Sequence, residues 1–413
     1  DTALRANGGR LVIRSGDPES VLDDMVVQNG VRVVFHHAET EPWGRARDER
    51  VRRRLSERGV DCHAVDDHLV AAPGTVLTGK GTMFGVFSAF RRVWETLPVL
   101  APEPFPHGLR FAAAGVSEPL PDVPAGIEWP VAAGEEAARE RWDGFRQQTL
   151  GAYSVDRDFP AVPGTTGLSP HLKFGMISVR RLLADCRDAM VAANSPEASD
   201  SVRVFVSELC WRDFYHHILH SFPRVETGCY QTRFDALGWE NDEKLFDVWR
   251  DGCTGYPVVD AAMRQLKQTG WMHNRSRMIV ASFLTKDLLI DWRWGERHFQ
   301  KHLIDGDLAA NNGGWQWAAG TGTDAQPWFR IFNPVSQGKR FDPDGAYVRE
   351  WVPELARVPS SKIHCPWELS ALELAHCGVR LGRDYPFPVV DHAVQRGRAL
   401  AMFKDSARGT EDT

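Results

Sequence analysis

Residues 270–317 read GWMHNRSRMIVASFLTKDLLIDWRWGERHFQKHLIDGDLAANNGGWQW, and this stretch decides how the rest of the chain is interpreted. It ends in the polar, glycine-containing segment DGDLAANNGG, although the core of a helical protein is ordinarily apolar. Paired charges are interspersed with five tryptophans, Trp271, Trp292, Trp294, Trp315 and Trp317. Indole rings next to polar side chains that a helical core would not need favour a cavity for a large, flat ligand with polar edges.

The first part of this stretch predicts a helix over residues 274–290 with one polar face. An amide, a guanidinium and a thioether share that face, because helical spacing aligns Asn274, Arg277, Met278 and Ala281. A buried helix whose arginine meets a carboxylate is the plainer alternative. The density of tryptophans and the polar segment after residue 305 outweigh it, so we expect this face to line a cavity.

Asp305, Gly306 and Asp307 are explained better by helix capping than by calcium binding. An EF-hand loop requires a glutamate at its twelfth position, where this chain has a glutamine. Asp307 instead suits the N-cap of a short helix that begins at the next residue. Capping leaves the side chains of Asp305, Asn311 and Asn312 unexplained, which again suits a polar ligand.

A second helix, predicted over residues 201–220, carries a charged and aromatic stripe. Its members recur at i, i+3, i+4 and i+7, and they are Glu208, Trp211, Arg212 and Tyr215. Glu208 and Arg212 could form no more than an ion pair within the helix, worth about 0.3 kcal/mol. A tryptophan between these charges is better explained by a flat ligand.

A loop ahead of another predicted helix has the composition of a phosphate-binding turn. Hydroxyl groups and a glycine at such a place can hold phosphate oxygens, although most runs of this kind are simple helix caps. The loop consists of Thr165, Thr166, Gly167, Leu168 and Ser169.

The chain begins with alternating strands and helices. We predict helices over residues 18–29 and 43–58, and strands over residues 11–13, 31–35 and 60–65. This order predicts a doubly wound parallel α/β domain over residues 1–70. The chain opens in mid-pattern without an initiating Met, as though an earlier strand were absent.

The rest of the chain divides into a connector and a helical domain. Residues 71–134 are rich in proline and glycine and predict a long connector with one short helix near residues 88–95. The aromatic segment around that helix is expected to dock the two domains. Helical periodicity from residue 135 predicts a larger all-α domain over residues 135–413.

Composition limits the cellular setting. Seven scattered cysteines without CxxC spacing argue against a disulfide framework or a zinc site, so we expect a cytoplasmic protein without a bound metal. No apolar run has the length of a membrane span. The net charge of −6 does not indicate nucleic-acid binding, so any such surface must be a local patch.

Four long motifs give the chain a resemblance to the photolyase/cryptochrome family. They are ELCWRDFYHH at residues 208–217, TGYPVVDAAMRQL at 254–266, GWMHNRSRM at 270–278 and LIDGDLAANNGGWQWAAGTGTDAQPWFRIFNP at 303–334. The resemblance implies an α/β domain joined to a helical domain that holds a U-shaped FAD. It is closest to the class I photolyases, which use light to repair cyclobutane pyrimidine dimers.

The resemblance assigns residues to the cofactor by position. It implies that FAD is held by Tyr153, Thr165, Thr166, Gly167, Leu168, Ser169, Arg212, Arg277, Asp305, Gly306, Asp307 and Asn311. It pairs Arg277 with Asp305 beside the flavin ring and places Asn311 near the reactive nitrogen. The tryptophans that pass electrons to the photoexcited flavin correspond to Trp315, Trp292 and Trp239.

The same resemblance assigns a lesion pocket and a DNA surface. The flipped-out dimer is expected to meet Glu208, Trp211, Asn274, Met278 and Trp317. DNA contacts are expected from these same residues other than Met278 and also from Tyr215, Arg157 and Arg275. The implied partner is UV-damaged DNA, bound by a monomer.

Three positions favour repair over the alternative, a cryptochrome-type blue-light photoreceptor. Asn274 stands where enzymes specific for 6-4 photoproducts have histidine, and Met278 is the choice of dimer-repair enzymes. Asn311 stands where plant cryptochromes usually have aspartate and insect ones cysteine. The family's Arg-rich opening segment is absent, so the presence of an antenna chromophore, a folate or a deazaflavin, is left open. A helical protein with an aromatic core and no cofactor is the third hypothesis.

Overall fold

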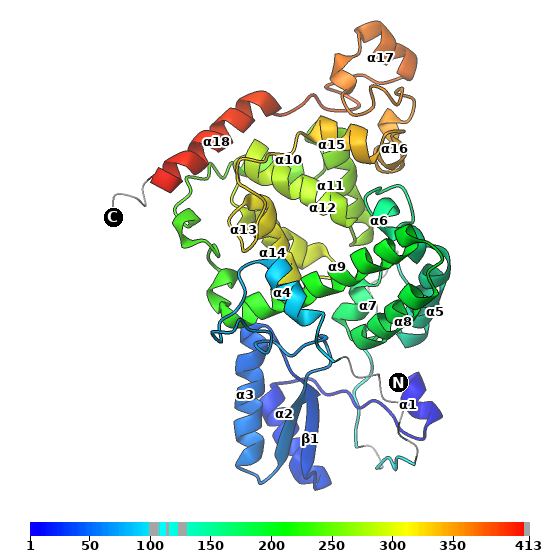
Figure 1. Cartoon of the computed structure of the whole chain (residues 1–413), viewed down its shortest axis with the longest axis vertical. Coiled ribbons are helices and arrows are strands. Elements are labelled where there is room, and N and C mark those ends of the chain that lie inside the picture. The colour runs from blue at the N-terminus through cyan, green and yellow to red at the C-terminus, as the bar shows by residue number, and fades with distance from the viewer. Residues whose placement is uncertain (99–105, 107, 113–114, 123–129, 409–413) are drawn as a thin grey trace.

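The computed structural model describes residues 1–98, 106, 108–112, 115–122 and 130–408. A small α/β part lies at one end of the molecule, and the helical part fills the other end (Figure 1). The elements of the α/β part are α1 (Thr2–Ala6), α2 (Pro18–Asn29), β1 (Val33–His37), α3 (Pro42–Ser56) and β2 (Asp61–Val65).

The two strands pair in parallel, as the alternation of strands and helices predicts. Val33 lies opposite Asp61, and the register continues to His37 opposite Val65. Helix α2 begins at the N-cap Asp17, whose carboxylate accepts from the Ser20 backbone N–H at 3.1 Å. A small core formed by Val26, Val51, Leu55 and Val60 holds both helices against the sheet.

The prediction of a strand over residues 11–13 is wrong. This segment has no ladder partner; it is tied to residues 117–118 instead. The Ile13 backbone N–H donates to the Ser117 hydroxyl, and its carbonyl accepts from the Glu118 N–H at 2.9 Å. Among the described residues this part therefore has two strands, and Phe35 on β1 is 70% exposed on the face that α2 and α3 leave open.

The connector crosses from the sheet to the helical part. Its helix α4 (Phe87–Trp94) packs on α9 through Phe87, Phe90 and Trp94. That this segment docks the two domains stays a prediction. The Trp94 indole N–H and two backbone N–H groups all donate to the buried carboxylate of Asp213. Parts of the predicted connector, residues 99–105, 107, 113–114 and 123–129, lie outside the described residues.

The helical part is built from α-helices and short 3-10 turns. The α-helices are α5 (Glu135–Gln148), α6 (Tyr153–Asp156), α7 (Ser169–Lys173), α8 (Val179–Ala192), α9 (Pro196–Ser221), α10 (Glu243–Arg250), α11 (Pro257–Thr269), α12 (Asn274–Ser282), α13 (Trp292–His302), α14 (Leu308–Ala319), α15 (Pro334–Phe341), α16 (Ala346–Trp351), α17 (Ala371–Cys377) and α18 (His392–Arg408). None of the helices in the described part of the chain has the length and apolar character needed to cross a membrane.

The helix predicted over residues 274–290 ends earlier than expected. Regular α12 gives way to a π-helical turn over Phe283–Asp287, and Leu289 has a positive φ of 53°. Helical periodicity carries no signal for this change, because the apolar residues continue through it. The turn directs Lys286 under the end of α14, where its ammonium donates to the Ala319 carbonyl at 2.7 Å.

Candidate active site

One cavity of about 550 Å³ lies among α6, α7, α9, α12 and α14. The two predicted polar faces meet across it. From α9 it receives Glu208, Trp211, Arg212 and Tyr215, and from α12 it receives Asn274, Arg277, Met278 and Ala281. The helical spacing in the sequence therefore predicted both walls correctly.

Close packing of α9 on α14 requires glycine in the segment DGDLAANNGG. A Cβ at Gly313 would lie 2.1 Å from the Tyr215 ring, and a Cβ at Gly295 on α13 would lie 2.0 Å from the Trp315 ring. No Cβ atom can lie this close to a ring atom. Both positions therefore require glycine, because an aromatic ring lies directly against the backbone there. This packing brings Asn311, Trp315 and Trp317 of α14 to the cavity wall.

The predicted pair of Arg277 and Asp305 is present. The guanidinium of Arg277 donates to Oδ2 of Asp305 at 2.8 Å, and the Ser169 hydroxyl donates to the same oxygen at 2.5 Å. The side chain of Asp305 is only 3% exposed, and its Oδ1 is buried without a hydrogen-bond partner. Arg277, Ser169 and Asp305 therefore form a hydrogen-bonded polar group in the cavity wall, in which Oδ1 of Asp305 has no partner.

Glu208 pairs with a different arginine from the one its spacing suggested. Arg157 donates to Glu208 at 2.7 Å and lies over the Tyr153 ring at 5.3 Å. The alternative of an isolated pair between Glu208 and Arg212 is therefore wrong. Arg275 is also paired, with Asp158 at 2.6 Å, so both arginines predicted to hold DNA phosphates contact carboxylates here.

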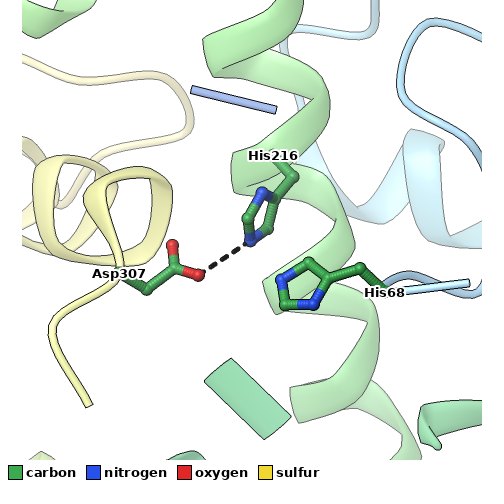
Figure 2. Close-up of side chains that lie close together, drawn as sticks. All are labelled: His68, His216 and Asp307. Carbon is green, nitrogen blue, oxygen red and sulfur yellow. Dashed lines mark hydrogen bonds and ion pairs between the residues drawn. The ribbon is translucent and has the colours of Figure 1, made fainter. Parts of the chain in front are cut away.

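Arg212 belongs to a buried cluster that joins three distant parts of the chain. Figure 2 shows three members of this cluster, His68, His216 and Asp307. It donates to the backbone carbonyl of His68 at 2.7 Å and also contacts that imidazole. His216 lies between Asp307, whose Oδ2 is 3.1 Å from Nε2, and the Thr40 hydroxyl, which is 2.8 Å from Nδ1. Ligand atoms of His68, His216 and Asp307 lie within 4.8 Å of one another, as in a metal site.

The charges of the cluster favour hydrogen bonding over a metal ion. Burial and the Arg212 charge lower the pKa of His68 to about 3. Burial alone would raise the pKa of Asp307, but the charge and hydrogen bond of His216, with the Arg212 charge, hold it well below the usual carboxyl range. A guanidinium already occupies the position beside His68, so a second cation there would be repelled. No sequence pattern predicted this cluster, because its members are far apart in the chain.

Asp307 also caps α14, as predicted. Its Oδ1 accepts from the Ala310 backbone N–H at 3.0 Å. The same side chain thus starts the helix and pairs with His216.

The remaining predicted cofactor residues lie around one end of the cavity. Tyr153, Thr166, Leu168, Ser169 and Gly306 line it, whereas Thr165 and Gly167 do not. Thr166 Oγ1 accepts from the Leu168 backbone N–H at 3.1 Å, an ordinary local cap. Sequence reasoning missed Arg141, whose guanidinium binds the Thr166 carbonyl, and also the apolar lining residues Phe205, Leu209, Phe299 and Leu303.

Two tryptophan rings, those of Trp211 and Trp317, lie in the cavity wall. Trp317 is half-buried in the wall, and Trp211 is stacked on Phe87 of α4 with ring centroids 3.7 Å apart. One face of Trp211 is therefore already covered by a residue of the connector.

Two of the three tryptophans predicted to relay electrons are buried, and the third is partly exposed. Trp315 lines the cavity, Trp292 is fully buried at the start of α13, and Trp239 is half-buried against Phe403 of α18. The indole N–H groups of all three are buried without an assigned hydrogen-bond partner. Their use as a relay stays a prediction.

Comparisons with known proteins agree with this site. Residues 1–107 match the family model of DNA photolyase, and residues 205–405 match the FAD binding domain of DNA photolyase. A deoxyribodipyrimidine photo-lyase of Synechococcus is 41% identical over 409 residues, which cover 96% of this chain and 82% of the relative. One from Vibrio cholerae is 46% identical over 372 residues, covering 88% and 77%.

Solved structures share the whole fold. A bacterial class III photolyase from Agrobacterium tumefaciens has a TM-score of 0.89 at 39% identity and covers 98% of this chain and 86% of its own. A cryptochrome of Synechocystis has a TM-score of 0.88 at 30% identity, covering 97% and 85%. The predicted assignment to class I is not decided by these similarities.

Proposed function

Because the chain belongs to the DNA photolyase family, we propose that it binds FAD and uses light to split cyclobutane pyrimidine dimers in damaged DNA. One observation carries this proposal. Most residues predicted for the cofactor and all those predicted for the lesion line the same cavity, so both ligands can be held next to each other.

The cavity has the size and chemistry that FAD requires. Its volume of about 550 Å³ is typical of small-molecule sites. Asp305, Arg277 and Asn311 are polar residues in its lining. Phe299, Leu303 and Ala310 supply apolar walls for a flat ring. FAD, when bound, supplies the light absorption and the electron, while these residues supply orientation and electrostatics.

The chain's own residues bind and orient the lesion. A dimer must leave the duplex to reach a cavity, as bases do in enzymes that act on them chemically. Trp317 and the open side of Trp211 offer stacking surfaces, and Glu208 and Asn274 offer hydrogen bonds to base edges. Met278 fills the space beside them. Ring opening then needs no protein nucleophile.

We propose that two arginines exchange their carboxylate partners for DNA phosphates when DNA binds. Arg157 leaves Glu208, and Arg275 leaves Asp158, when phosphates that flank the lesion reach them. Contacts of this kind give affinity without sequence preference. They also free Glu208 to accept hydrogen bonds from the lesion.

We propose the finer assignments on the same basis. Residues 1–70 form a doubly wound antenna-type domain, residues 71–134 connect it, and residues 135–413 bind FAD and the lesion. The parallel strands and the separate small core beside them support this division. Trp239, Trp292 and Trp315 relay electrons inward to the flavin. We further propose a cytoplasmic monomer; an antenna such as a folate or a deazaflavin is left open.

The test is light-dependent repair. Reduced, FAD-loaded protein is expected to clear thymine dimers from DNA under near-UV light and not in darkness. Trp317→Ala should weaken dimer binding about tenfold or more, because a base stacked on an aromatic ring is worth about 1–3 kcal/mol. Flavin photoreduction should survive that substitution. Trp43→Ala is the matched control, because Trp43 lies on α3 with 68% of its surface exposed.

The alternative of a blue-light photoreceptor has support in the likeness to the Synechocystis cryptochrome. Photoreduction without any light-dependent loss of dimers would favour it over repair. Unchanged dimer binding by Trp317→Ala would show that the lesion pocket is assigned wrongly.

A further inference from the structure

Trp211, which the proposed function uses as a stacking surface for the lesion, is supported by one side chain of the connector. The Phe87 ring lies parallel to the indole, with centroids 3.7 Å apart and an angle of 6° between the ring planes. Phe87 is buried, whereas Trp211 is half-buried in the cavity wall. Phe87 therefore acts on a ligand in the cavity only through Trp211.

The other ring contacts of Trp211 come from its own helix. Phe214 meets the indole edge to face at 5.6 Å, and Tyr215 is tilted against it at 5.4 Å. Both residues lie on α9, as Trp211 does. Among the described residues, the ring contact from outside α9 is that of Phe87. A parallel ring on another element opposes rotation of the indole, because a turn of the side chain would lift one ring off the other.

The backbone of Phe87 is held by the loop that follows α14. Phe87 is the first residue of α4, and the N-cap position is Val86, which has no side-chain oxygen to accept from the first turn. Asp324 supplies this oxygen, since its Oδ2 accepts from the Phe87 backbone N–H at 3.0 Å. The Thr323 hydroxyl donates to the Gly85 carbonyl at 2.9 Å. A carboxylate is also favoured at a helix N-terminus by the helix dipole.

Both ends of α4 are thus anchored on the elements that carry the two stacking surfaces. At its end the Trp94 indole N–H donates to Asp213 at 2.8 Å, two residues after Trp211 on α9. At its start Asp324 belongs to the loop after α14, which carries Trp317. Asp324 adopts a positive φ of 42°, a conformation that aspartate tolerates better than most residues.

We propose that Phe87 is a positioning residue for the lesion, which holds the Trp211 ring in place for stacking, and that Asp324 acts by holding Phe87. The inference rests on the proposed function, because it takes the flipped-out dimer as the group that stacks on the open face of Trp211. A ring that is already fixed loses little freedom when a base stacks on it, so the affinity for the dimer rises. Undamaged DNA places no base there, so its affinity is independent of Phe87.

The experiment measures, in darkness, how tightly FAD-loaded protein binds DNA with one thymine dimer and undamaged DNA of the same sequence. Phe87→Leu keeps an apolar side chain but removes the flat ring. We expect it to lower the preference for dimer-containing DNA about fivefold, as for the loss of an aromatic pair, with unchanged affinity for undamaged DNA. Phe84→Leu is the matched control, because the half-buried Phe84 ring of the same segment meets Phe90 at 6.3 Å instead.

A double substitution separates positioning from a general loss of structure. In protein that carries Trp211→Ala, adding Phe87→Leu should change the preference no further, because the ring that Phe87 positions is already gone. Asp324→Ala should lower the preference about twofold, whereas Asp324→Asn should restore it, since the amide oxygen can accept from the same N–H. Asp324 is exposed, so these two variants test the inference even if Phe87→Leu does not fold.

Flavin content and the unfolding midpoint check that each variant is folded. The inference is overturned if Phe87→Leu keeps the full preference for dimer-containing DNA, or if it lowers the affinity for both DNAs equally. It is also overturned if Phe87→Leu costs as much in the Trp211→Ala protein as in the unsubstituted one. Lack of any preference in the unsubstituted protein would instead refute the proposed lesion binding, and this inference with it.

Discussion

Asp305 uses a single carboxylate oxygen to accept from both Arg277 and Ser169, and its other oxygen is buried without a hydrogen-bond partner. A buried carboxylate of this kind is tolerated only because its charge is paired. The sequence indicated the pair through the family resemblance, but it did not indicate that Ser169 would join it. That contact brings the loop of residues 165–169 to the cavity.

We predict that Asp305→Asn lowers the free energy of unfolding of the flavin-free protein by about 2–3 kcal/mol, because it leaves the Arg277 guanidinium without its charge partner. Urea denaturation measures this change. Asp247→Asn is the control, because it breaks an ion pair with Arg250 in which Asp247 is 57% exposed. Exposed pairs are worth less than about 1 kcal/mol. Equal losses in both variants would contradict the buried-pair interpretation.

For individual helices, the periodicity of the sequence predicted which side chains share a face better than it predicted where the helix ends. The stripes of α9 and α12 reach the cavity as their spacing requires, because a helix fixes which side chains share a face. The π-helical turn after Ser282 was not predictable, since hydrogen bonding to residues beyond the helix selects it. The strand over residues 11–13 failed for a related reason. Three apolar residues fit a strand, yet a strand also needs a neighbour to pair with.

Helix α14 provides the test at this scale, because Asp307 both caps it and accepts from His216. Asp307→Ala is expected to cost about 3 kcal/mol of unfolding free energy, from a lost cap worth about 1 kcal/mol and a charged hydrogen bond worth about 2 kcal/mol. Asp307→Asn should cost clearly less, because an amide oxygen still caps the helix. Denaturation of the flavin-free variants compares the two. An equal cost would mean that the cap contributes nothing.

The whole molecule is held together by contacts that no local pattern could reveal. Thr40 and His68 of the α/β part, His216 of α9 and the α14 N-cap Asp307 meet in one cluster. Figure 2 shows the two histidines and Asp307. A single sequence shows which residue types are present, but it does not show that these four residues lie together in the fold. The comparisons with solved structures give the same overall arrangement of the chain.

This cluster predicts how stability depends on pH. Burial and the Arg212 charge hold the pKa of His68 at about 3, whereas an unfolded histidine titrates near 6.5. Below about pH 6.5 the unfolded chain therefore binds a proton that the folded chain refuses, and stability falls as the pH falls. The loss attributable to His68 should be about 1.5 kcal/mol between about pH 7 and about pH 5. The Asp307 carboxylate, with its lowered pKa, loses its contribution only at lower pH.

Urea denaturation at both pH values tests this on His68→Gln, whose amide can still accept from Arg212 but cannot be protonated. We expect the stability difference between the two pH values to shrink by about 1.5 kcal/mol in that variant. Other histidines with lowered pKa values should contribute to the remaining difference, among them His217, His273, His298 and His364. His63→Gln, at an exposed position on β2, should leave the difference unchanged. If His68→Gln behaves like that control, the imidazole is not buried against Arg212 in solution, and the contact between the segment around His68 and α9 is described wrongly.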